Sequence, residues 1–174
     1  MKQRLYIMIG CPGSGKSTFA KNKLMISPFP KIIYVSRDEI RFSLLKEGES
    51  YFDREKEVYR EFIWQIYDAL NKGYDVIADA THLNEKSRSK LFKNLPNDFS
   101  NIEVVGIYMR PSLETCIARN EKRKGTKYYV PVEDLRKMYF ATKPPSMNEC
   151  NGAFDIILTI NDNDFVAKRE VKEK

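Results

Sequence analysis

One short stretch near the N-terminus restricts the fold of this chain more than any other feature. Residues 10–18 read GCPGSGKST and match the pattern GxxxxGK followed by Ser or Thr. The apolar run 5–9 precedes this stretch, and a helical pattern at 17–25 follows it. A glycine-rich turn between a strand and a helix is typical of α/β proteins whose sheet is mainly parallel.

The rest of the chain favours the same architecture. Strand-length apolar runs are mostly continuous rather than alternating, as expected for strands buried on both faces of a parallel sheet. They occur at 5–9, 32–35, 76–78, 102–108 and 154–160, and helical patterns occur at 17–25, 38–46, 54–72, 84–93, 112–122 and 132–141. We therefore predict a three-layer α/β fold with a five-stranded parallel sheet and right-handed crossovers, formed as a single domain over residues 1–174.

Composition limits the class of protein. With 42% hydrophobic and 31% charged residues, the chain is expected to be globular and soluble. No apolar run approaches the roughly 20 residues that a membrane-spanning helix needs, and the first apolar segment is short for a signal peptide. We expect no membrane association and a cytoplasmic location. The three cysteines and the lone His82 show no metal-binding spacing, and the net charge of +6 suits a phosphate-rich partner without requiring one.

The glycine-rich stretch predicts a phosphate-binding loop. Glycines let the backbone N–H groups wrap around phosphate oxygens, and the following helix adds a favourable dipole. Lys16 is expected to bridge the β- and γ-phosphates of ATP, and the hydroxyl of Ser17 is expected to bind Mg²⁺. The residues predicted to hold the nucleotide in this loop are Gly10, Gly13, Ser14, Gly15, Lys16, Ser17 and Thr18.

The end of the second predicted strand supplies candidates for the acceptor side. Asp38 and Arg41 are three residues apart at a predicted helix start, so both project from one face. A carboxylate there could accept the proton of an acceptor hydroxyl, and Arg41 could bind a phosphate of the acceptor. Ser36 and Glu39 form the pattern of a capping box, which explains those two residues but not Asp38 or Arg41.

The third predicted strand ends in the sequence ADATHLN, residues 78–84. Asp79 could hold the hydration shell of Mg²⁺ or the acceptor, and Thr81 is a second candidate for the acceptor. A capping or loop role for this acid is equally compatible with the sequence. We expect His82 to lie on the surface or in the acceptor cleft rather than to carry protons.

A basic segment further along predicts a lid. Arg119 and Arg123 are four residues apart on one face of a predicted helix, and Gly125 follows as a hinge. A mobile basic flap would exclude water from the triphosphate and neutralise charge on the transferred group. A solvated basic helix end is the alternative interpretation.

These segments together resemble the kinase domain of phage-type polynucleotide 5′-hydroxyl kinases. The resemblance runs from GCPGSGKST through SRDEIR and DATHLN to RNEKRKGTKYYVPVEDLRKMY, which is most of the chain. The glycine-rich stretch is shared by a very large superfamily, whereas RDxxR and the later basic block are far more specific. The resemblance implies an adenylate-kinase-like P-loop fold with a helical lid and a tunnel-like active site.

The resemblance also implies a reaction and roles for single residues. It implies transfer of the γ-phosphate of ATP to the 5′-OH end of RNA or DNA, with Mg²⁺. Lys16 and Ser17 would then serve the triphosphate and the metal. Asp38 resembles the general base of the family, Arg41 its contact to an acceptor phosphate, and Arg123 its lid arginine.

The chain departs from the phage pattern at two places. Lys124 is an additional residue between the lid arginine and Gly125. In the phage enzymes the acid of the third-strand motif stands beside the threonine, where this chain has Ala80, and Asp79 comes one position earlier. The stretch 162–166 matches DxDxT/V, which we interpret as a chance match; residues 161–164 lie in the loop after the last predicted strand and could line the adenine pocket.

Two other functions use the same loop. One is a kinase for a small metabolite, nucleoside or antibiotic, in which Arg41 would grip a different anion. The other is a nucleotide-binding module or toxin-like regulator that acts on a protein partner, because the loop predicts binding and not turnover. The sequence favours the polynucleotide kinase and leaves the oligomeric state open.

Overall fold

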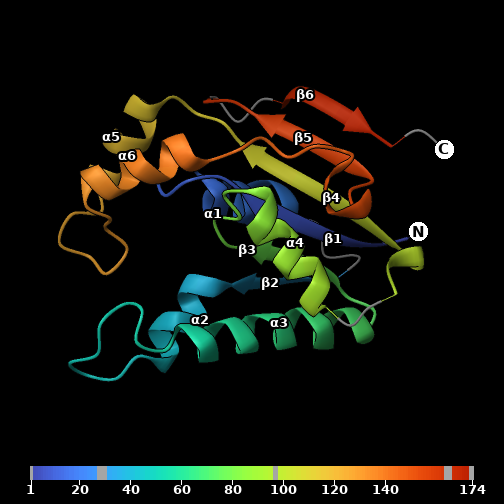
Figure 1. Ribbon diagram of the computed structural model, residues 1–174, viewed down its shortest axis with the longest axis horizontal. Coiled ribbons are helices and arrows are strands. Elements are labelled where there is room, and N and C mark those ends of the chain that lie inside the picture. The colour runs from blue at the N-terminus through green and yellow to red at the C-terminus, as the bar shows by residue number, and fades with distance from the viewer. Residues whose placement is uncertain (1, 27–30, 96–97, 163–165, 173–174) are drawn as a thin grey trace.

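The computed structural model describes residues 2–26, 31–95, 98–162 and 166–172 (Figure 1). In these residues one six-stranded sheet has the order β2-β3-β1-β4-β5-β6. Neighbouring strands pair in parallel up to β5, and β6 pairs with β5 in the antiparallel direction. The strands are β1 Gln3–Ile9, β2 Ile32–Ser36, β3 Asp75–Asp79, β4 Ile102–Met109, β5 Ile156–Ile160 and β6 Val166–Val171.

The helices follow the strands in the alternation that the sequence predicts. The α-helices are α1 Lys16–Phe19, α2 Arg37–Leu44, α3 Glu55–Asn71, α4 Glu85–Asn94, α5 Leu113–Glu121 and α6 Val132–Ala141. The predicted helix 17–25 is divided, because α1 continues as the π-helix η1, Ala20–Leu24. Short 3₁₀ turns occur at η2, Phe99–Asn101, and at η3, Glu149–Asn151. The α/β fold class is confirmed.

The predicted number of strands is wrong by one, because β6 follows the last predicted strand. Its sequence, VAKREV, has no continuous apolar run, and most of its side chains are exposed. It pairs only with β5 and forms the edge of the sheet in the described residues. Charged residues are usual on edge strands, because they discourage pairing with another chain.

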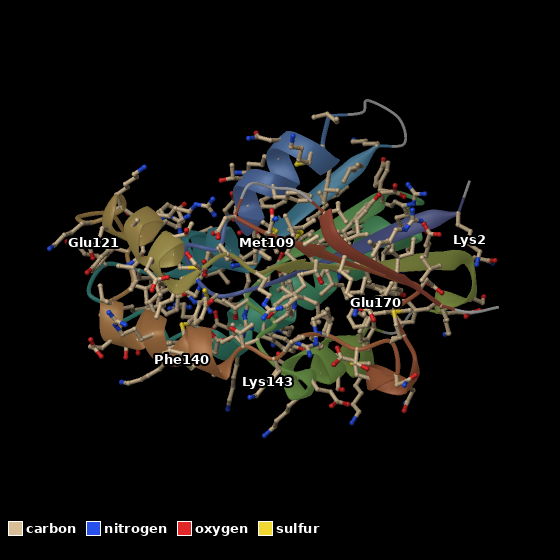
Figure 2. All side chains as sticks on the ribbon, turned by 90° about the horizontal axis from the view of Figure 1, so that it is seen from above. Lys2, Met109, Glu121, Phe140, Lys143 and Glu170 are labelled. Carbon is tan, nitrogen blue, oxygen red and sulfur yellow. The ribbon has the colours of Figure 1, made fainter. Side chains whose placement is uncertain are left out.

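The sheet is buried on both faces, which accounts for its continuous apolar strands. On one face, Leu5 and Ile7 pack in a cluster with Phe62 of α3. On the other face, Met8 packs in a cluster with Phe19 of α1. Figure 2 shows α1 and α4 on opposite sides of the sheet. This is the predicted three-layer arrangement.

The parallel register aligns the carboxyl ends of β1, β2 and β3. Met8 of β1 and Ser36 of β2 are both in register with Asp79 of β3. Figure 1 shows the α2–α3 and α5–α6 connections on this same side of the molecule. In Figure 2, Glu121 at the end of α5 lies at the opposite side from Lys2. Ligands of open α/β sheets bind beyond the carboxyl ends of the strands, so a site is expected beyond the carboxyl ends of β1, β2 and β3.

None of the helices in the described segments has both the length and the apolar composition that crossing a membrane requires.

Candidate active site

The glycine-rich loop between β1 and α1 is closely packed against α5. Gly13 has φ +76°, and a Cβ atom there would lie 2.4 Å from the carbonyl oxygen of Cys116. Gly15 has φ +95°, and its Cβ would lie 3.1 Å from the guanidinium of Arg119. The backbone N–H of Gly10 donates to the carbonyl of Thr81 at 3.0 Å, which ties the loop to the end of β3. The loop therefore needs glycine for both conformation and space.

Lys16 lies over the loop rather than in solvent. Its side chain is buried, and its Nζ donates to the carbonyl oxygen of Cys11 at 3.0 Å. The hydroxyl of Ser14, also buried, lies 3.5 Å from the same Nζ. The ammonium group is thus held at the mouth of the loop, where phosphate oxygens would meet both it and the backbone N–H groups.

Ser17, Asp79 and Tyr34 meet at a single carboxylate oxygen. The hydroxyl of Ser17 donates to Oδ2 of Asp79 at 2.6 Å, and the hydroxyl of Tyr34 donates to the same oxygen. Asp79 is buried. Burial, with the charge of Asp79 adding to it, raises the pKa of Tyr34, so the phenol keeps its proton and acts as a donor.

This group of oxygens fits Mg²⁺. The ion takes oxygen ligands, and it is usually held by one or two carboxylates together with substrate phosphates and water. Ser17 and Asp79 provide a hydroxyl and a carboxylate beside the phosphate-binding loop. When bound there with ATP, Mg²⁺ would neutralise charge on the β- and γ-phosphates. Asp79, for which the sequence left metal and acceptor roles open, therefore lies on the donor side.

Asp38 and Arg41 meet each other at the start of α2. Nη1 of Arg41 lies 2.7 Å from Oδ1 of Asp38, and Nη2 of Arg41 lies 2.6 Å from Oε2 of Glu55. The hydroxyl of Tyr51 donates to Oδ1 of Asp38 at 2.7 Å and accepts from Nη1 of Arg41 at 2.7 Å. The side chain of Arg41 is 5% exposed and that of Asp38 is 53% exposed. The buried guanidinium of Arg41 thus forms an ion pair with the accessible carboxylate of Asp38.

Two buried N–H groups beside this pair have no partner in the described residues. They are Nε of Arg37 and Nε of Arg41. Arg37 pairs with Glu55, and its pKa is lowered by burial and by the charge of Arg41. A buried donor without a partner is costly, so an anion bound here would satisfy groups that the protein leaves unpaired.

The first turn of α2 is capped as the sequence predicts, but only in part. Oγ of Ser36 accepts from the backbone N–H of Glu39 at 3.3 Å. The carboxylate of Glu39 does not complete the capping box and instead pairs with Lys21 of η1 at 3.4 Å. This pair connects the helix that carries Asp38 to the helix that follows the phosphate-binding loop.

Arg119 and Arg123 lie on one side of the loop. Arg119, on α5, donates to the carbonyl oxygens of Ser14 at 3.2 Å and Asp162 at 3.1 Å. Helix α5 ends at Glu121, so Arg123 lies in the turn after it and not on the predicted helical face. Both arginines nevertheless line one cavity of about 230 Å³, together with Gly15, Thr18 and Lys122.

Part of the predicted lid, including Arg123, lies in the segment 122–131 between α5 and α6, and Asn120 joins the two ends of this segment. The buried side chain of Asn120 donates to the carbonyl of Val130 at 2.7 Å and accepts from the N–H of Val130 at 3.1 Å. Within the segment, Nζ of Lys127 lies 4.7 Å from the ring centroid of Phe42 on α2. The ring of Tyr128 meets Phe42 edge-on at 5.1 Å. The lid therefore touches the acceptor side.

Residues 5–145 of the chain match the AAA domain family AAA_33. The chain belongs to this family. It is a P-loop kinase, and relatives among polynucleotide kinases confirm the resemblance seen in its motifs.

The curated relatives of this P-loop kinase are longer proteins. A protein of Autographa californica nuclear polyhedrosis virus, named for bifunctional polynucleotide kinase/RNA ligase activity, is 28% identical over 150 residues. The L-seryl-tRNA(Sec) kinase of Methanococcus maripaludis is 33% identical over 142 residues. These matches cover 79% and 78% of this chain, but only 20% and 51% of the two relatives.

Solved structures agree at the level of the fold. A chain of the Pnkp1/Rnl/Hen1 RNA repair complex has a TM-score of 0.67 at 23% identity, over 80% of this chain and 44% of that chain. A fungal RNA kinase has a TM-score of 0.65 at 13% identity, over 99% and 78%. A gluconokinase from Sinorhizobium meliloti 1021 has a TM-score of 0.55 at 17% identity, over 94% and 82%.

The expectation that His82 lies on the surface of this P-loop kinase is wrong, because the side chain is buried. Its Nδ1 lies 2.8 Å from the carbonyl oxygen of Met8, and its own carbonyl accepts from the buried Arg88 at 2.9 Å. Burial lowers the pKa of His82 to about 4, so the imidazole is neutral and Nδ1 is the donor. His82 has φ +44°, and it supports the junction between β1 and the loop after β3.

The loop after β5 lies partly outside the described residues. Asp162 accepts from Arg119 through its carbonyl and from the N–H of Ser112 through Oδ1, at 3.0 Å. Residues 163–165, which complete the DxDxT/V match, are outside the described residues. The loop precedes β6, so the prediction that it follows the last strand is wrong. Its role at the adenine stays a prediction.

Sequence reasoning missed three residues of the site of this P-loop kinase. Tyr34 shares the Asp79 oxygen with Ser17, and its place two residues before Ser36 on one strand could have suggested it. Tyr51 and Glu55 reach Asp38 and Arg41 from the α2–α3 connection and the start of α3. No motif marks them, because these contacts depend on how that connection folds back.

Proposed function

We propose that this P-loop kinase transfers the γ-phosphate of ATP to the 5′-hydroxyl end of RNA or DNA. The observation that carries the proposal is the Asp38–Arg41 pair at the end of β2. Ser36, two residues before Asp38, is in register with Asp79, and Asp79 accepts from Ser17 of the phosphate-binding loop. A base and an anion-binding arginine thus stand one strand away from the donor site.

The chemistry of Asp38 suits a general base. Its side chain is 53% exposed, so an acceptor hydroxyl can reach it, and Arg41 fixes its orientation. Asp38 would accept the proton of the 5′-hydroxyl as the oxygen attacks the γ-phosphate in line. Lys16 would stabilise the charge on the transferred group from the side of the loop.

The chemistry of Arg41 suits a polyanionic acceptor. Its Nη atoms contact Asp38, Tyr51 and Glu55, whereas its buried Nε has no partner in the described residues. A phosphate oxygen next to the 5′-terminal nucleoside would satisfy that N–H with a charge-assisted hydrogen bond. A neutral sugar or nucleoside supplies no such anion, and the polynucleotide kinase among the relatives supports a nucleic-acid end over a charged metabolite.

The lid would close the donor side. Arg119 and Arg123 line the cavity beside Gly15 and Thr18, within the region where the nucleotide is expected. Arg123 in this position would neutralise charge on the transferred phosphoryl group and help to exclude water. The polynucleotide kinase among the curated relatives supports the proposed acceptor, and the seryl-tRNA kinase supports an acceptor hydroxyl carried on RNA.

One experiment tests the acceptor. The protein is incubated with γ-labelled ATP, Mg²⁺ and a short 5′-OH oligonucleotide of RNA or DNA, and parallel reactions contain seryl-tRNA, nucleosides or gluconate. We expect label at the oligonucleotide 5′ end and none on an oligonucleotide that already carries a 5′-phosphate.

Each other result has a definite meaning. Label on a nucleoside or sugar acid, with none on the oligonucleotide, would replace the proposal by a small-molecule kinase. Label on seryl-tRNA alone would move the function to that relative's acceptor. Binding of ATP without transfer to any acceptor would favour a nucleotide-binding module.

A further inference from the structure

The hydroxyl of Tyr51 makes the hydrogen bond that an acceptor hydroxyl would need to make. It donates to Oδ1 of Asp38 at 2.7 Å and accepts from Nη1 of Arg41 at 2.7 Å. An acceptor hydroxyl must also donate to Asp38 before its proton can be taken. The phenol thus occupies one of the two carboxylate oxygens that could take the proton of the acceptor.

The ring of Tyr51 is held at the surface by contacts that can be broken without opening the core. The Arg41 guanidinium lies 4.1 Å from its centroid, and Phe42 and Phe52 meet it edge-on at 6.1 and 4.8 Å. The side chain is 40% exposed. Gly48, three residues earlier, has φ +83° with open space around it. The residue thus lies on a surface connection rather than in a packed layer.

The phenol is suited to remain a donor in this position. Burial of the hydroxyl, followed by the charge of Asp38, raises the pKa of Tyr51. A protonated phenol occupies the carboxylate without giving up its proton. It also occupies the space in which a water molecule could be activated by Asp38.

We propose that Tyr51 fills the acceptor-hydroxyl subsite until the acceptor displaces it, and that it thereby keeps water from Oδ1 of Asp38. This inference rests on the proposed role of Asp38 as the base. It assigns Tyr51 a positioning and gating role at the acceptor side, where it would set the balance between phosphoryl transfer and wasteful hydrolysis of ATP.

The test compares wild-type protein with Tyr51→Phe, which keeps the ring and removes only the hydroxyl. Two rates are measured: hydrolysis of ATP without acceptor, and transfer to a 5′-OH oligonucleotide over a range of its concentration. We expect acceptor-free hydrolysis to rise, and the KM for the oligonucleotide to fall by about three- to tenfold, the equivalent of one competing hydrogen bond. The kcat for transfer should change by less than about twofold.

The matched control is Tyr74→Phe, immediately before β3 and outside this group of residues, which should change neither rate. Thermal unfolding of each variant is recorded alongside. If Tyr51→Phe does not fold, Tyr51→Leu removes the same hydroxyl and is read in the same way.

A purely structural role of Tyr51 predicts that acceptor-free hydrolysis falls in Tyr51→Phe, whereas the proposal predicts that it rises. If Tyr51 only holds Asp38 in place, Tyr51→Phe lowers both hydrolysis and the kcat for transfer, and the proposal is wrong. Unchanged rates overturn it as well. Failure of the polynucleotide assignment is a separate result: wild-type protein would then not label the oligonucleotide, while the hydrolysis comparison would still decide the role of Tyr51, because water is its acceptor.

Discussion

The donor and acceptor sides of this site are built from different materials. On the donor side the phosphate-binding loop consists of backbone and small residues, and it packs on α5 so closely that a Cβ at Gly13 would lie 2.4 Å from a carbonyl oxygen. The acceptor side consists of long side chains, with Arg41 connecting Asp38, Tyr51 and Glu55. One side is fixed by sterics, and the other by polar contacts that a ligand can exchange.

This difference separates what is general from what is particular in the molecule. A backbone cradle accepts a triphosphate whatever the acceptor, as expected for a loop shared across many P-loop kinases. On the proposed function, selection among acceptors would come from side chains at the start of α2 and in the connection after it. Changes on the donor side should therefore affect ATP binding and folding, whereas changes on the acceptor side should affect turnover and the acceptor.

The largest effect should come from Asp38→Asn, which removes the base and keeps the shape of the side chain. We expect kcat to fall by about 10²-fold or more, with the affinity for ATP near that of wild type. Measurement of kcat by transfer of labelled phosphate, and of ATP affinity by calorimetry, checks both parts. Glu39→Gln, one residue away and paired with Lys21, is the control and should retain turnover within a few-fold. An equal loss of ATP affinity in Asp38→Asn would place Asp38 on the donor side.

The next effect is the pH dependence of the free energy of unfolding that His82 causes. Burial lowers the pKa of His82 to about 4, against an ordinary value of 6.5. As the pH falls below 6.5, the imidazole of His82 binds a proton in the unfolded chain but stays neutral in the folded protein. His82 should therefore reduce the free energy of unfolding by about 2 kcal/mol between pH 7 and pH 5.

Urea unfolding at the two pH values measures this contribution. His82→Asn is the comparison, because an amide can donate to Met8 as Nδ1 does and tolerates the positive φ without titrating. The variant should lose less stability than wild type over this range. Equal losses in the two proteins would show that the imidazole is not the group that titrates.

Gly13→Ala tests the steric character of the loop. A Cβ there must displace the backbone of Cys116, so we expect a loss of about 1–3 kcal/mol in the free energy of unfolding, with weaker ATP binding. Gly73→Ala is the control, since Gly73 has φ +80° but open space around it. Only the crowding differs between the two sites. If both variants lose the same stability and neither loses ATP affinity, the loop is less tightly fixed than the contact indicates.

The smallest effect should come from Tyr34→Phe. Without its hydroxyl, the carboxylate of Asp79 keeps only Ser17 as a side-chain donor among the described residues. We expect the Mg²⁺ concentration for half-maximal binding of a fluorescent ATP analogue to rise by about three- to tenfold, the equivalent of one hydrogen bond. Tyr6→Phe, on β1, is the control. An unchanged Mg²⁺ requirement would separate Tyr34 from the metal site.

The phosphate-binding loop and the order of strands and helices could be predicted from sequence, because both depend on local pattern. The glycine spacing predicts the loop, and continuous apolar runs predict the parallel strands. Strand β6 could not be predicted in this way, because VAKREV has the exposed, charged composition of an edge. The end of α5 at Glu121 also required the structure, since the basic residues that follow would suit a longer helix equally well.

The acceptor side was only half predictable. Asp38 and Arg41 follow from their spacing at a helix start, but Tyr51 and Glu55 reach them across 13 and 14 residues of chain. The burial of a single residue cannot be predicted from its sequence neighbours either. His82 has polar neighbours in the sequence, and its side chain is nevertheless buried. Contacts that depend on how a connection folds back carry no periodic signal, so they are found only in three dimensions.

The clamp between Asn120 and Val130 has a consequence for how this kinase can vary. The side-chain NH2 of Asn120 donates to the carbonyl of Val130, and the side-chain oxygen of Asn120 accepts from the N–H of Val130, so the segment between the two residues is a closed loop with fixed ends. Extra residues in this segment, as the resemblance to phage-type kinases implies for Lys124, would then lengthen the loop without moving α5 or α6. The stretch after Arg123 is therefore a place where related kinases could gain or lose residues.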